Sequence, residues 1–510
     1  MMSDNLLLKK VFSATYWGMF STVVAGVVQL MIVPLLIGTY GKANYGLMML
    51  AFSIFTYLRL LDFGMLSGSI RYGAMWLSTD KSERIESLFQ TNVFFFAVIG
   101  FLSALILIWL GNNAGNLFNL NPEQESLFKW MMWILAFNAV LDCLSTVFNI
   151  LFSAHQEVAW IGKTVTVKNI VLIATILYVV TFNISLIWYF LTHTIASIAQ
   201  FLLYLVVSYR KKLLFTDYLK PKFNKNIFKE VFSYSLSLFS MRVFQISALY
   251  LRPIMIGIVT VDSVLIIADY TIIQTICTLV IAFSGVFAQI LLPLMSKSIA
   301  LEEHEKISQI LHRGTKYISI FVVSLICILV INIEQILELY VGSEYTHLSS
   351  WAIVALITLL SLHSAPVSSF IMASGRLTPL IIFSALNAMA SLGLIALLVP
   401  EYDVGGAIIS FLIYTIFQQS FIYGFYIRKY FKIPVRMLLM KGFLSPVFAG
   451  AIAVVCSLTL VDLIYIETNV VQILFNSSLF ALIYVSLCLG FIVKPKEVRE
   501  LFMKFFNGKV

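Results

Sequence analysis

Charged side chains interrupt several long apolar segments of this sequence, and such groups could bind an anion or carry a proton. A charge at the centre of a membrane-spanning helix costs at least about 2.5 to 3.5 kcal/mol, so these residues usually face protein or water. Arginine stays protonated and holds phosphate through paired hydrogen bonds, whereas a carboxylate can bind H⁺, Na⁺ or a cationic compound. The charged residues of this kind are Arg59, Arg71, Lys168, Arg242, Arg252, Asp62, Asp142 and Asp269.

The stretch LRLLDFGMLSGSIRYGAM at 58–75 holds three of these charges. Arg59 and Asp62 are neighbours on one helix face, so they either form a local ion pair or Asp62 orients Arg59 toward an anionic ligand. Arg71 lies on the opposite face near one membrane surface, where it binds the same ligand or snorkels to the headgroups, as does Lys168. The glycines of the stretch would let a neighbouring helix pack closely: Gly64, Gly68 and Gly73.

Arg242 and Arg252 occur on one later apolar segment, about 15 Å apart along a helix. One surface could expose both to an anion that moves, and a diphosphate is such an anion. Asp269, on the next segment, is the alternative partner of Arg252. Pro253 and Pro34 lie inside two long segments, and both are predicted hinges.

The composition identifies the surroundings of these charges. Hydrophobic residues make up 60% of the chain and charged residues 12%, and the mean hydropathy is +0.95. Segments of about 20 apolar residues, each long enough to cross about 30 Å of hydrocarbon, recur along the sequence. We predict an all-α integral membrane protein with about fourteen transmembrane helices. They are placed at 12–38, 45–76, 90–110, 127–153, 160–181, 185–209, 229–258, 264–295, 315–333, 348–374, 378–399, 404–427, 437–461 and 470–493.

The loops between these spans differ in charge. Most Lys and Arg residues fall on the side that holds both termini, including a cluster at 210–229, and the opposite side carries mainly acidic residues. Because short cytoplasmic loops collect positive charge, both termini are predicted to be cytoplasmic. The net charge of +9 then reflects topology and contact with anionic lipid, and no nucleic-acid partner is expected.

The sequence repeats itself at a spacing of about 220 residues. VFS at 11–13 returns at 231–233, ERIESLF at 83–89 matches EKISQIL at 305–311, and LFSAHQE at 151–157 matches IMASGRL at 371–377. An even number of spans in each repeat gives both halves the same orientation, so they are parallel repeats. The predicted organisation is a six-helix bundle at 1–210, a basic cytoplasmic linker at 211–228, a second six-helix bundle at 229–430, and two additional helices with a tail at 431–510. The polar links at 78–89 and 297–313 are predicted to be short amphipathic helices on the cytoplasmic surface.

Motifs for covalent chemistry or metal binding do not occur in the sequence. The five cysteines lack metal-ligand spacing and fall within predicted spans, and the six histidines are scattered without an HExxH, CxxC or GxSxG arrangement. We therefore expect no cofactor, no metal site and no enzymatic activity.

Three short elements resemble a known family: YGKANYGLMML, LLDFGM and RYGA, all between residues 40 and 74. They are similar to elements of the polysaccharide exporters and O-antigen flippases (Wzx-type) of the multidrug/oligosaccharidyl-lipid/polysaccharide (MOP) exporter superfamily. The resemblance implies a two-lobed fold and passage of an undecaprenyl-diphosphate-linked oligosaccharide from the inner to the outer leaflet of a bacterial inner membrane. It adds polysaccharide polymerase machinery as an expected partner, and fourteen spans resemble the relatives that include the lipid II flippase.

Alternating access through a cationic central cavity is the mechanism we expect, with Arg59, Arg71, Arg242 and Arg252 contacting the diphosphate. A multidrug antiporter coupled to H⁺ or Na⁺ on the same fold is one alternative, and it would use Asp62, Asp142 and Asp269. A polysaccharide polymerase or ligase is the other, but no predicted outer loop is long enough for a structured catalytic insertion.

The predicted topology can be tested with single cysteine probes. A cysteine at Asn121 should react with a membrane-impermeant maleimide in intact cells, because that loop is predicted to be external. A cysteine at Lys220 should react only after the cells are permeabilised. External labelling at Lys220 would contradict the two-bundle scheme.

Overall fold

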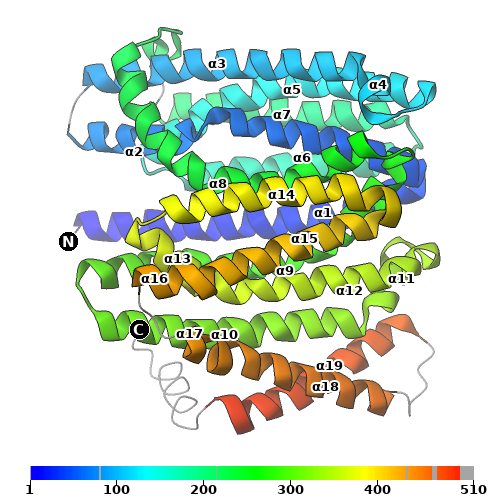
Figure 1. Cartoon of the computed structure of the whole chain (residues 1–510). Helices are drawn as coiled ribbons and strands as arrows, with labels where there is room; N and C mark the ends of the chain where they lie inside the picture. Colours follow the sequence, from blue (N-terminus) through cyan, green and yellow to red (C-terminus); the bar gives the residue numbers. More distant parts are fainter. Residues whose placement is uncertain (1, 80–81, 214, 432–434, 462–467, 494–510) are drawn as a thin grey trace. The chain divides into compact units, whose positions relative to one another are not determined.

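The computed structural model describes residues 2–79, 82–213, 215–431, 435–461 and 468–493. Within these residues the chain forms helices joined by short turns, and there is no β-strand (Figure 1). Twelve of the described helical segments are long and apolar enough to cross a membrane. The all-α, multi-pass membrane class predicted from the sequence is therefore confirmed.

The prediction of about fourteen spans differs from this count at two places. The predicted spans 12–38 and 45–76 join into one segment, Tyr16–Asp62, although the backbone of α1 (Met2–Leu58) leaves helical geometry at Gly41, with φ 79° and ψ 163°. The predicted span 229–258 falls in α8 (Lys225–Val259), whose described apolar part is the shorter Tyr250–Val259. The count of fourteen is approximate for these reasons.

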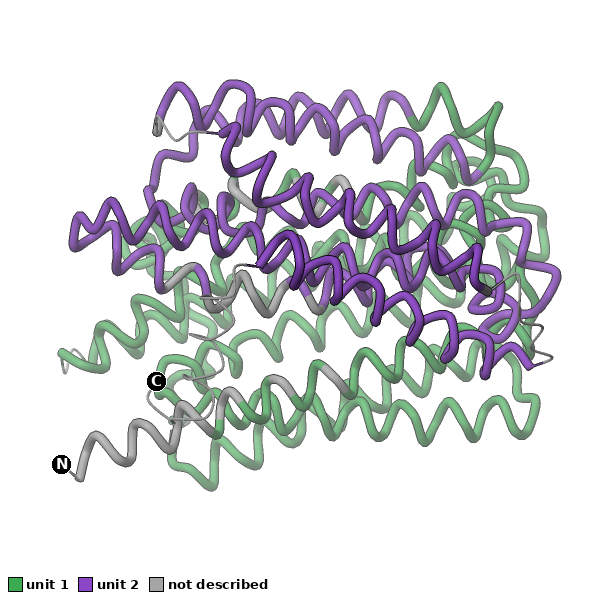
Figure 2. Tube along the Cα trace, turned by 90° about the horizontal axis from the view of Figure 1, so that it is seen from below, with its two compact units in different colours: residues 1–271, 395–403 green, residues 272–394, 404–510 purple. Residues whose placement is uncertain are grey.

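Two compact units make up the chain (Figure 2): unit 1 contains residues 1–271 and 395–403, and unit 2 contains residues 272–394 and 404–510. The first helices are α1, η1 (Arg59–Asp62), α2 (Met65–Ser78), α3 (Ser82–Asn112), α4 (Ala114–Phe118), α5 (Pro122–Ala154), α6 (Ala159–Thr181), α7 (Leu186–Arg210), η2 (Thr216–Leu219) and α8. The arrangement of two repeated bundles with a linker at 211–228 remains a prediction.

The helices that follow start with α9 (Ser263–Ala300), which continues from unit 1 into unit 2. Then come α10 (His304–Ile331), α11 (Ile333–Val341), η3 (Ser343–Leu348), α12 (Ser349–Thr358), η4 (Leu359–Ser364), α13 (Ala365–Ser374), α14 (Thr378–Tyr402) and α15 (Val404–Ser420). The last are η5 (Phe421–Tyr426), α16 (Ile427–Phe431), α17 (Val435–Met437), η6 (Leu438–Leu444), α18 (Ser445–Val461), α19 (Asn469–Leu487) and η7 (Cys488–Ile492). The elements η5, η6 and η7 are π-helices, whereas η1 to η4 are 3₁₀-helices.

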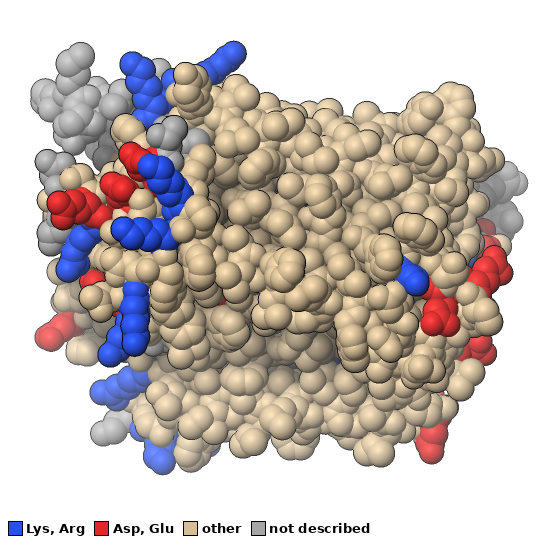
Figure 3. Space-filling model, turned by 90° about the horizontal axis from the view of Figure 1, so that it is seen from above, with Lys and Arg blue, Asp and Glu red and all other residues tan. Residues whose placement is uncertain are grey.

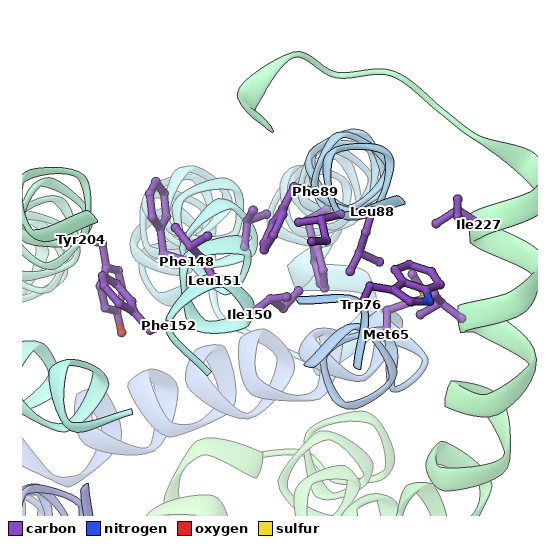
Figure 4. Packing of buried hydrophobic residues seen from close by; sticks show 14 of the residues in the cluster. Met65, Trp76, Leu88, Phe89, Phe148, Ile150, Leu151, Phe152, Tyr204 and Ile227 are labelled. Carbon is purple, nitrogen blue, oxygen red and sulfur yellow. The ribbon is translucent and has the colours of Figure 1, made fainter. Parts of the chain in front are cut away.

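Large apolar side chains form the core of unit 1 where α2, α3, α5 and α7 meet α8. Trp76, Phe89 and Phe152 are each at most 1% exposed in this cluster (Figure 4). Leu88 and Phe89 belong to the polar link that was predicted to lie on the membrane surface. Residues 82–89 are helical with this apolar side buried, but they form the first turns of α3 and not a separate short helix. Their place at the membrane surface remains a prediction.

The second polar link, at 297–313, also contributes apolar side chains to a core, in unit 2. Ile307 and Leu311 are buried in a core that also contains Phe370, Tyr423 and Tyr426. The link therefore joins the end of α9 to the start of α10 and contributes to the core of the unit.

The helices α18 and α19 pack against α10 in unit 2. Phe480 and Tyr484 of α19 meet Val323 of α10 and Ala453 of α18 in a small apolar core. The Asn476 amide nitrogen donates to the Asn332 side-chain oxygen at 3.0 Å, which pairs two amides that would otherwise be costly inside a membrane.

Charge is distributed along the helices as the positive-inside rule requires. The face seen in Figure 3 has an apolar central band, Lys and Arg gathered with some acids at one end of the helices, and mainly Asp and Glu at the other. This pattern agrees with a membrane-spanning orientation of the helices.

Gly46 marks a close approach of α1 to the start of α9. A Cβ atom at this position would lie 1.7 Å from the carbonyl oxygen of Val264, which is backbone and cannot rotate away. Gly38, in the same helix, has nothing within 4 Å of the corresponding position. Gly46 thus sets the separation between two helices, whereas Gly38 is free of packing constraints.

We expect Gly46→Ala to destabilise the protein, since α1 and α9 must move apart, at a cost of about 1 to 3 kcal/mol. The thermal unfolding midpoint of the purified protein in detergent measures this effect. Gly38→Ala is the matched control and should unfold at or above the wild-type temperature, because alanine favours the helix. Equal midpoints for both variants would show that the approach at Gly46 is not rigid.

Candidate functional site

A break in the helical backbone places the first charged residues. After α1, the chain forms the short 3₁₀-helix η1, then Phe63 and Gly64 adopt left-handed conformations with φ 47° and 77°, and α2 begins at Met65. Glycine adopts this conformation readily, whereas phenylalanine does so at a cost. The Asp62 carboxylate accepts a hydrogen bond of 2.9 Å from the Gly64 N–H, which stabilises the turn. The predicted span 45–76 is therefore two helices, not one.

Glycines of the same stretch bring α8 against α2, as predicted. A Cβ at Gly64 would lie 2.7 Å from the Ser235 carbonyl oxygen, and one at Gly68 would lie 2.0 Å from the Ser235 hydroxyl. Gly73 instead faces Ala154 and Leu88. Small residues at these positions allow helices in a membrane to approach closely.

A cavity of about 130 Å³ lies beside the break, inside unit 1. Three charged residues predicted from the sequence line it together: Arg59, Asp62 and Asp142. The rest of its lining comes from α1, α2, α3 and α5 and includes the polar Ser103 and Thr146. A broken helix within a membrane is tolerated where it lines such a cavity or is packed in protein.

A local ion pair between Arg59 and Asp62 was one of two interpretations from the sequence, and the described residues do not form it. Asp62 binds the backbone of Gly64, while Arg59 is exposed and makes no hydrogen bond or ion pair with the described residues. The physical reason is the turn itself, because the Gly64 N–H needs an acceptor and the Asp62 carboxylate lies within reach. Asp62 therefore stabilises the break, and Arg59 is left available for a ligand.

Asp142 of α5 pairs with Lys168 of α6. The distance between Asp142 Oδ1 and Lys168 Nζ is 3.9 Å, and the side chains are only 18% and 17% exposed. Lys168 was considered a residue that snorkels to the membrane surface, but in the structure it lies inside unit 1 beside a carboxylate. A buried Lys168 ammonium without the Asp142 carboxylate would destabilise the protein more than the buried pair does.

Further polar groups surround this pair, and sequence analysis did not select them. The Asn138 amide nitrogen donates to the Thr194 hydroxyl at 2.6 Å. Four buried side-chain atoms of α5, α6 and α7 have no hydrogen-bond partner in the described part of the chain: Asn138 Oδ1, Asn169 Nδ2, His193 Nδ1 and Ser197 Oγ. Their spacing was a usable signal, because Asn138 lies one helical turn from Asp142 and His193 lies one turn from Ser197.

The remaining candidates lie outside the lining of this cavity. Arg71 is exposed, and its guanidinium carbon lies 4.1 Å from the ring centre of Tyr234. Asp269 forms an ion pair with Lys42, with an Oδ1 to Nζ distance of 2.7 Å. Arg252 is fully buried and has an interaction partner. The side chain of Arg242 lies outside the described residues.

The predicted hinge prolines lie within helices. Pro34 is inside α1 and Pro253 is inside α8. In α1 the non-helical residue is Gly41 and not Pro34. Whether these prolines act as hinges remains a proposal.

The sequence of this chain matches the model of a known protein family. A family model described as "Polysaccharide biosynthesis protein" matches residues 7–299, which is more than half of the chain. No curated protein sequence matches the chain significantly.

Several solved structures have a similar fold. The lipid II flippase MurJ, in an inward closed conformation, has a TM-score of 0.70 at 14% identity, covering 92% of this chain and 98% of its own. An inward-facing multidrug resistance MATE family transporter of the MOP superfamily has a TM-score of 0.65 at 12% identity, covering 79% and 94%. A MOP superfamily transporter from Pyrococcus furiosus has a TM-score of 0.55 at 11% identity, covering 82% and 95%.

The pair between Asp142 and Lys168 predicts a non-additive effect on stability. Asp142→Asn alone should lower the free energy of unfolding by up to about 3 kcal/mol, because Lys168 loses its partner. Adding Lys168→Met should recover part of that loss, which a double-mutant cycle on thermal unfolding would measure. Asp217→Asn is the control, since it removes an exposed ion pair with Lys220 and should change stability by under about 1 kcal/mol. Additive effects of the two substitutions would show that the pair does not couple.

Proposed function

Because the chain belongs to the polysaccharide biosynthesis protein family, we propose that it moves an undecaprenyl-diphosphate-linked oligosaccharide across the membrane. The substrate would pass from the inner to the outer leaflet of a bacterial inner membrane, and both termini would be cytoplasmic. An O-antigen or related surface-polysaccharide unit is the substrate class we favour. Polysaccharide polymerase machinery would receive the product.

The proposal rests on the position of Arg59 at the cavity and on its lack of a hydrogen bond or ion pair with the described residues. It lines the cavity at the broken helix, is exposed, and makes no hydrogen bond or ion pair with the described residues. The acidic neighbours are occupied, since Asp62 binds the Gly64 N–H and Asp142 faces Lys168. Arg59 thus offers a forked donor at membrane depth whose neighbouring carboxylates are hydrogen-bonded or paired with other groups, and such a donor suits a diphosphate oxygen pair.

The other arginines enter the proposal as further contacts along the path. Arg252 is buried in α8, and Arg71 is exposed at the far side of α2. Together with Arg242, they would guide the diphosphate during alternating access, while Pro34 and Pro253 would let their helices bend. The oligosaccharide moves unchanged in this scheme, so no covalent step is assigned to any side chain.

An ion-coupled multidrug antiporter is the second candidate, and one observation favours it. Asp62 and Asp142 line the same cavity, and buried carboxylates are the groups that carry H⁺ or Na⁺ in membrane proteins. Asp269 is less suited to this role because it pairs with Lys42. The two candidates differ in whether the arginine or the carboxylates are essential.

Substitutions of Arg59 test the flippase proposal. In cells lacking their own flippase, Arg59→Gln should lower export of the lipid-linked oligosaccharide roughly tenfold or more, equivalent to about 1.4 kcal/mol of lost interaction. Arg59→Lys should retain an intermediate level, since charge remains but the forked geometry is lost. Arg84→Gln is the matched control because Arg84 pairs with Glu230 at a surface-exposed position. Normal export by well-expressed Arg59→Gln would refute the proposal.

Asp62→Asn separates the two candidates. An asparagine oxygen can still accept the hydrogen bond from the Gly64 N–H, so the turn should persist and export should fall less than in Arg59→Ala. If Asp62 instead carried a coupling proton, Asp62→Asn would abolish transport as completely as Arg59→Ala. Export measured at matched protein levels distinguishes these outcomes.

A further inference from the structure

A second broken helix, in unit 2, contains a buried histidine. The 3₁₀-helix η4 separates α12 from α13 within the predicted span 348–374. His363 of η4 is 4% exposed, and its Nδ1 lies 2.8 Å from the carbonyl oxygen of Leu360. A carbonyl oxygen only accepts, so Nδ1 carries the hydrogen and Nε2 keeps its lone pair in the neutral ring.

Two aromatic rings stack on His363. Tyr423 of η5 stacks on it with ring centres 5.4 Å apart and planes 11° apart. Phe443 of η6 stacks on it at 3.9 Å and 20°. Both rings come from π-helices, which occur frequently at functional sites. Phe443 belongs to the part of the chain that was predicted as an addition to the repeat, so that addition helps to close the site.

Three polar side-chain atoms in this junction are buried and have no hydrogen-bond partner among the described residues. They are His363 Nε2, Gln419 Oε1 and Tyr423 Oη. Gln419 is positioned by its amide nitrogen, which donates to the Ser364 hydroxyl at 3.2 Å and to the Ser361 carbonyl at 3.4 Å. It lies one helical turn before Tyr423, so both residues approach η4 from the same side.

A fourth unpaired atom lies close to the same junction. Thr315 Oγ1 of α10 is buried without a partner, and a Cβ on Gly442 would lie 3.1 Å from the Thr315 methyl group. Gly442 immediately precedes Phe443. The unpaired atoms are thus contributed by α10, η4, α15 and η5, and all of these lie in unit 2.

Buried polar groups are nearly always hydrogen-bonded, and internal water satisfies those that protein groups do not. Such a water needs two to four polar partners. Here two atoms can only accept in the neutral state, His363 Nε2 and Gln419 Oε1, while the hydroxyls can donate or accept. Water supplies two donors and two acceptors and matches this set, whereas a metal ion would meet no carboxylate.

Ionisable groups on the neighbouring elements are few. Among the described residues, α12 and α13 carry none, and η5 carries only tyrosines. Lys441 of η6 is exposed, and Lys316 of α10 is buried, with its nitrogen 5.3 Å from the Tyr317 ring centre. The others on α10 are His304, Glu305, Lys306, His312, Arg313, Tyr317 and Cys327. His363 is therefore the one imidazole of η4 among a mostly uncharged set.

We propose that η4, η5 and η6 enclose a hydrated proton-accepting site in unit 2, with water bound by His363 Nε2, Gln419 Oε1 and Tyr423 Oη. On acidification the bound water delivers a proton as hydronium. An N–H bond forms at His363 Nε2, an O–H bond of hydronium breaks, and neutral water and an imidazolium remain. This inference is independent of the proposed substrate, because it rests on groups in unit 2 and not on the cavity in unit 1.

Radiolytic footprinting of the whole protein in lipid nanodiscs tests the water. Hydroxyl radicals formed from bound water modify side chains that touch it even when they are buried, so His363 and Tyr423 should be oxidised. Phe480 and Phe190, both fully buried in apolar surroundings, are the reference residues and should be protected. Gln419→Leu should lower the oxidation of His363 several-fold. Protection of His363 and Tyr423 equal to that of Phe480 would overturn the hydrated site.

Solid-state nitrogen NMR of ¹⁵N-histidine-labelled protein in bilayers tests the proton. Subtracting the spectrum of His363→Phe isolates the ring signals of His363, which should change from the singly to the doubly protonated form between about pH 8 and pH 4. His347 is the matched control, because its Nδ1 also faces a carbonyl oxygen three residues earlier, that of Glu344 at 2.7 Å, but its side chain is exposed. Titration of His347 without any change at His363 would overturn the proton-accepting role. The assay needs no transport substrate, so it cannot fail merely because the proposed function is wrong.

Discussion

A helix that breaks inside a bilayer must satisfy every backbone group that the break releases, because no water is available in the hydrocarbon to do so. In unit 1 this requirement is met at Phe63 and Gly64. The Phe63 N–H donates to the Leu60 carbonyl, the Asp62 carboxylate accepts from Gly64, and the Gly64 carbonyl accepts from Ser67 and Gly68 in the first turn of α2. The position of Arg59, the adjoining cavity and the close contact with α8 all depend on this short turn.

The sequence predicted the membrane class and located the charges within the apolar segments because both signals are strong and local. Long apolar runs identify spans, and a charge such as Asp142 within a run is conspicuous. The sequence did not predict the breaks at η1 and η4, because apolar residues flank both and hydropathy does not distinguish a broken helix from a continuous one. Knowing that a glycine lies two residues after Asp62 was enough to suggest close packing, but it was not enough to predict a left-handed turn.

Partner choice was the least predictable property of the candidate site. Helical spacing left a pair with Arg59 open for Asp62, but the Asp62 carboxylate accepts from the Gly64 N–H, which needs an acceptor. Snorkelling to the membrane surface was one of two interpretations of Lys168, whereas in the structure Lys168 pairs with the Asp142 carboxylate inside unit 1. In both cases the decisive partner comes from the tertiary fold or from the break, and neither can be read from the spacing of two charges on one helix.

The π-helix η6 has a consequence for how the chain tolerates changes in length. A π-turn holds one more residue than the α-helical turn it replaces, so the helix after it is rotated by about 100° relative to an uninterrupted α-helix. Deleting one residue from η6 could therefore restore regular α-helical bonding without unfolding the segment. The same deletion would turn the lipid-facing and protein-facing sides of α18 relative to Phe443. Length, as well as residue type, is thus fixed at this point of the chain.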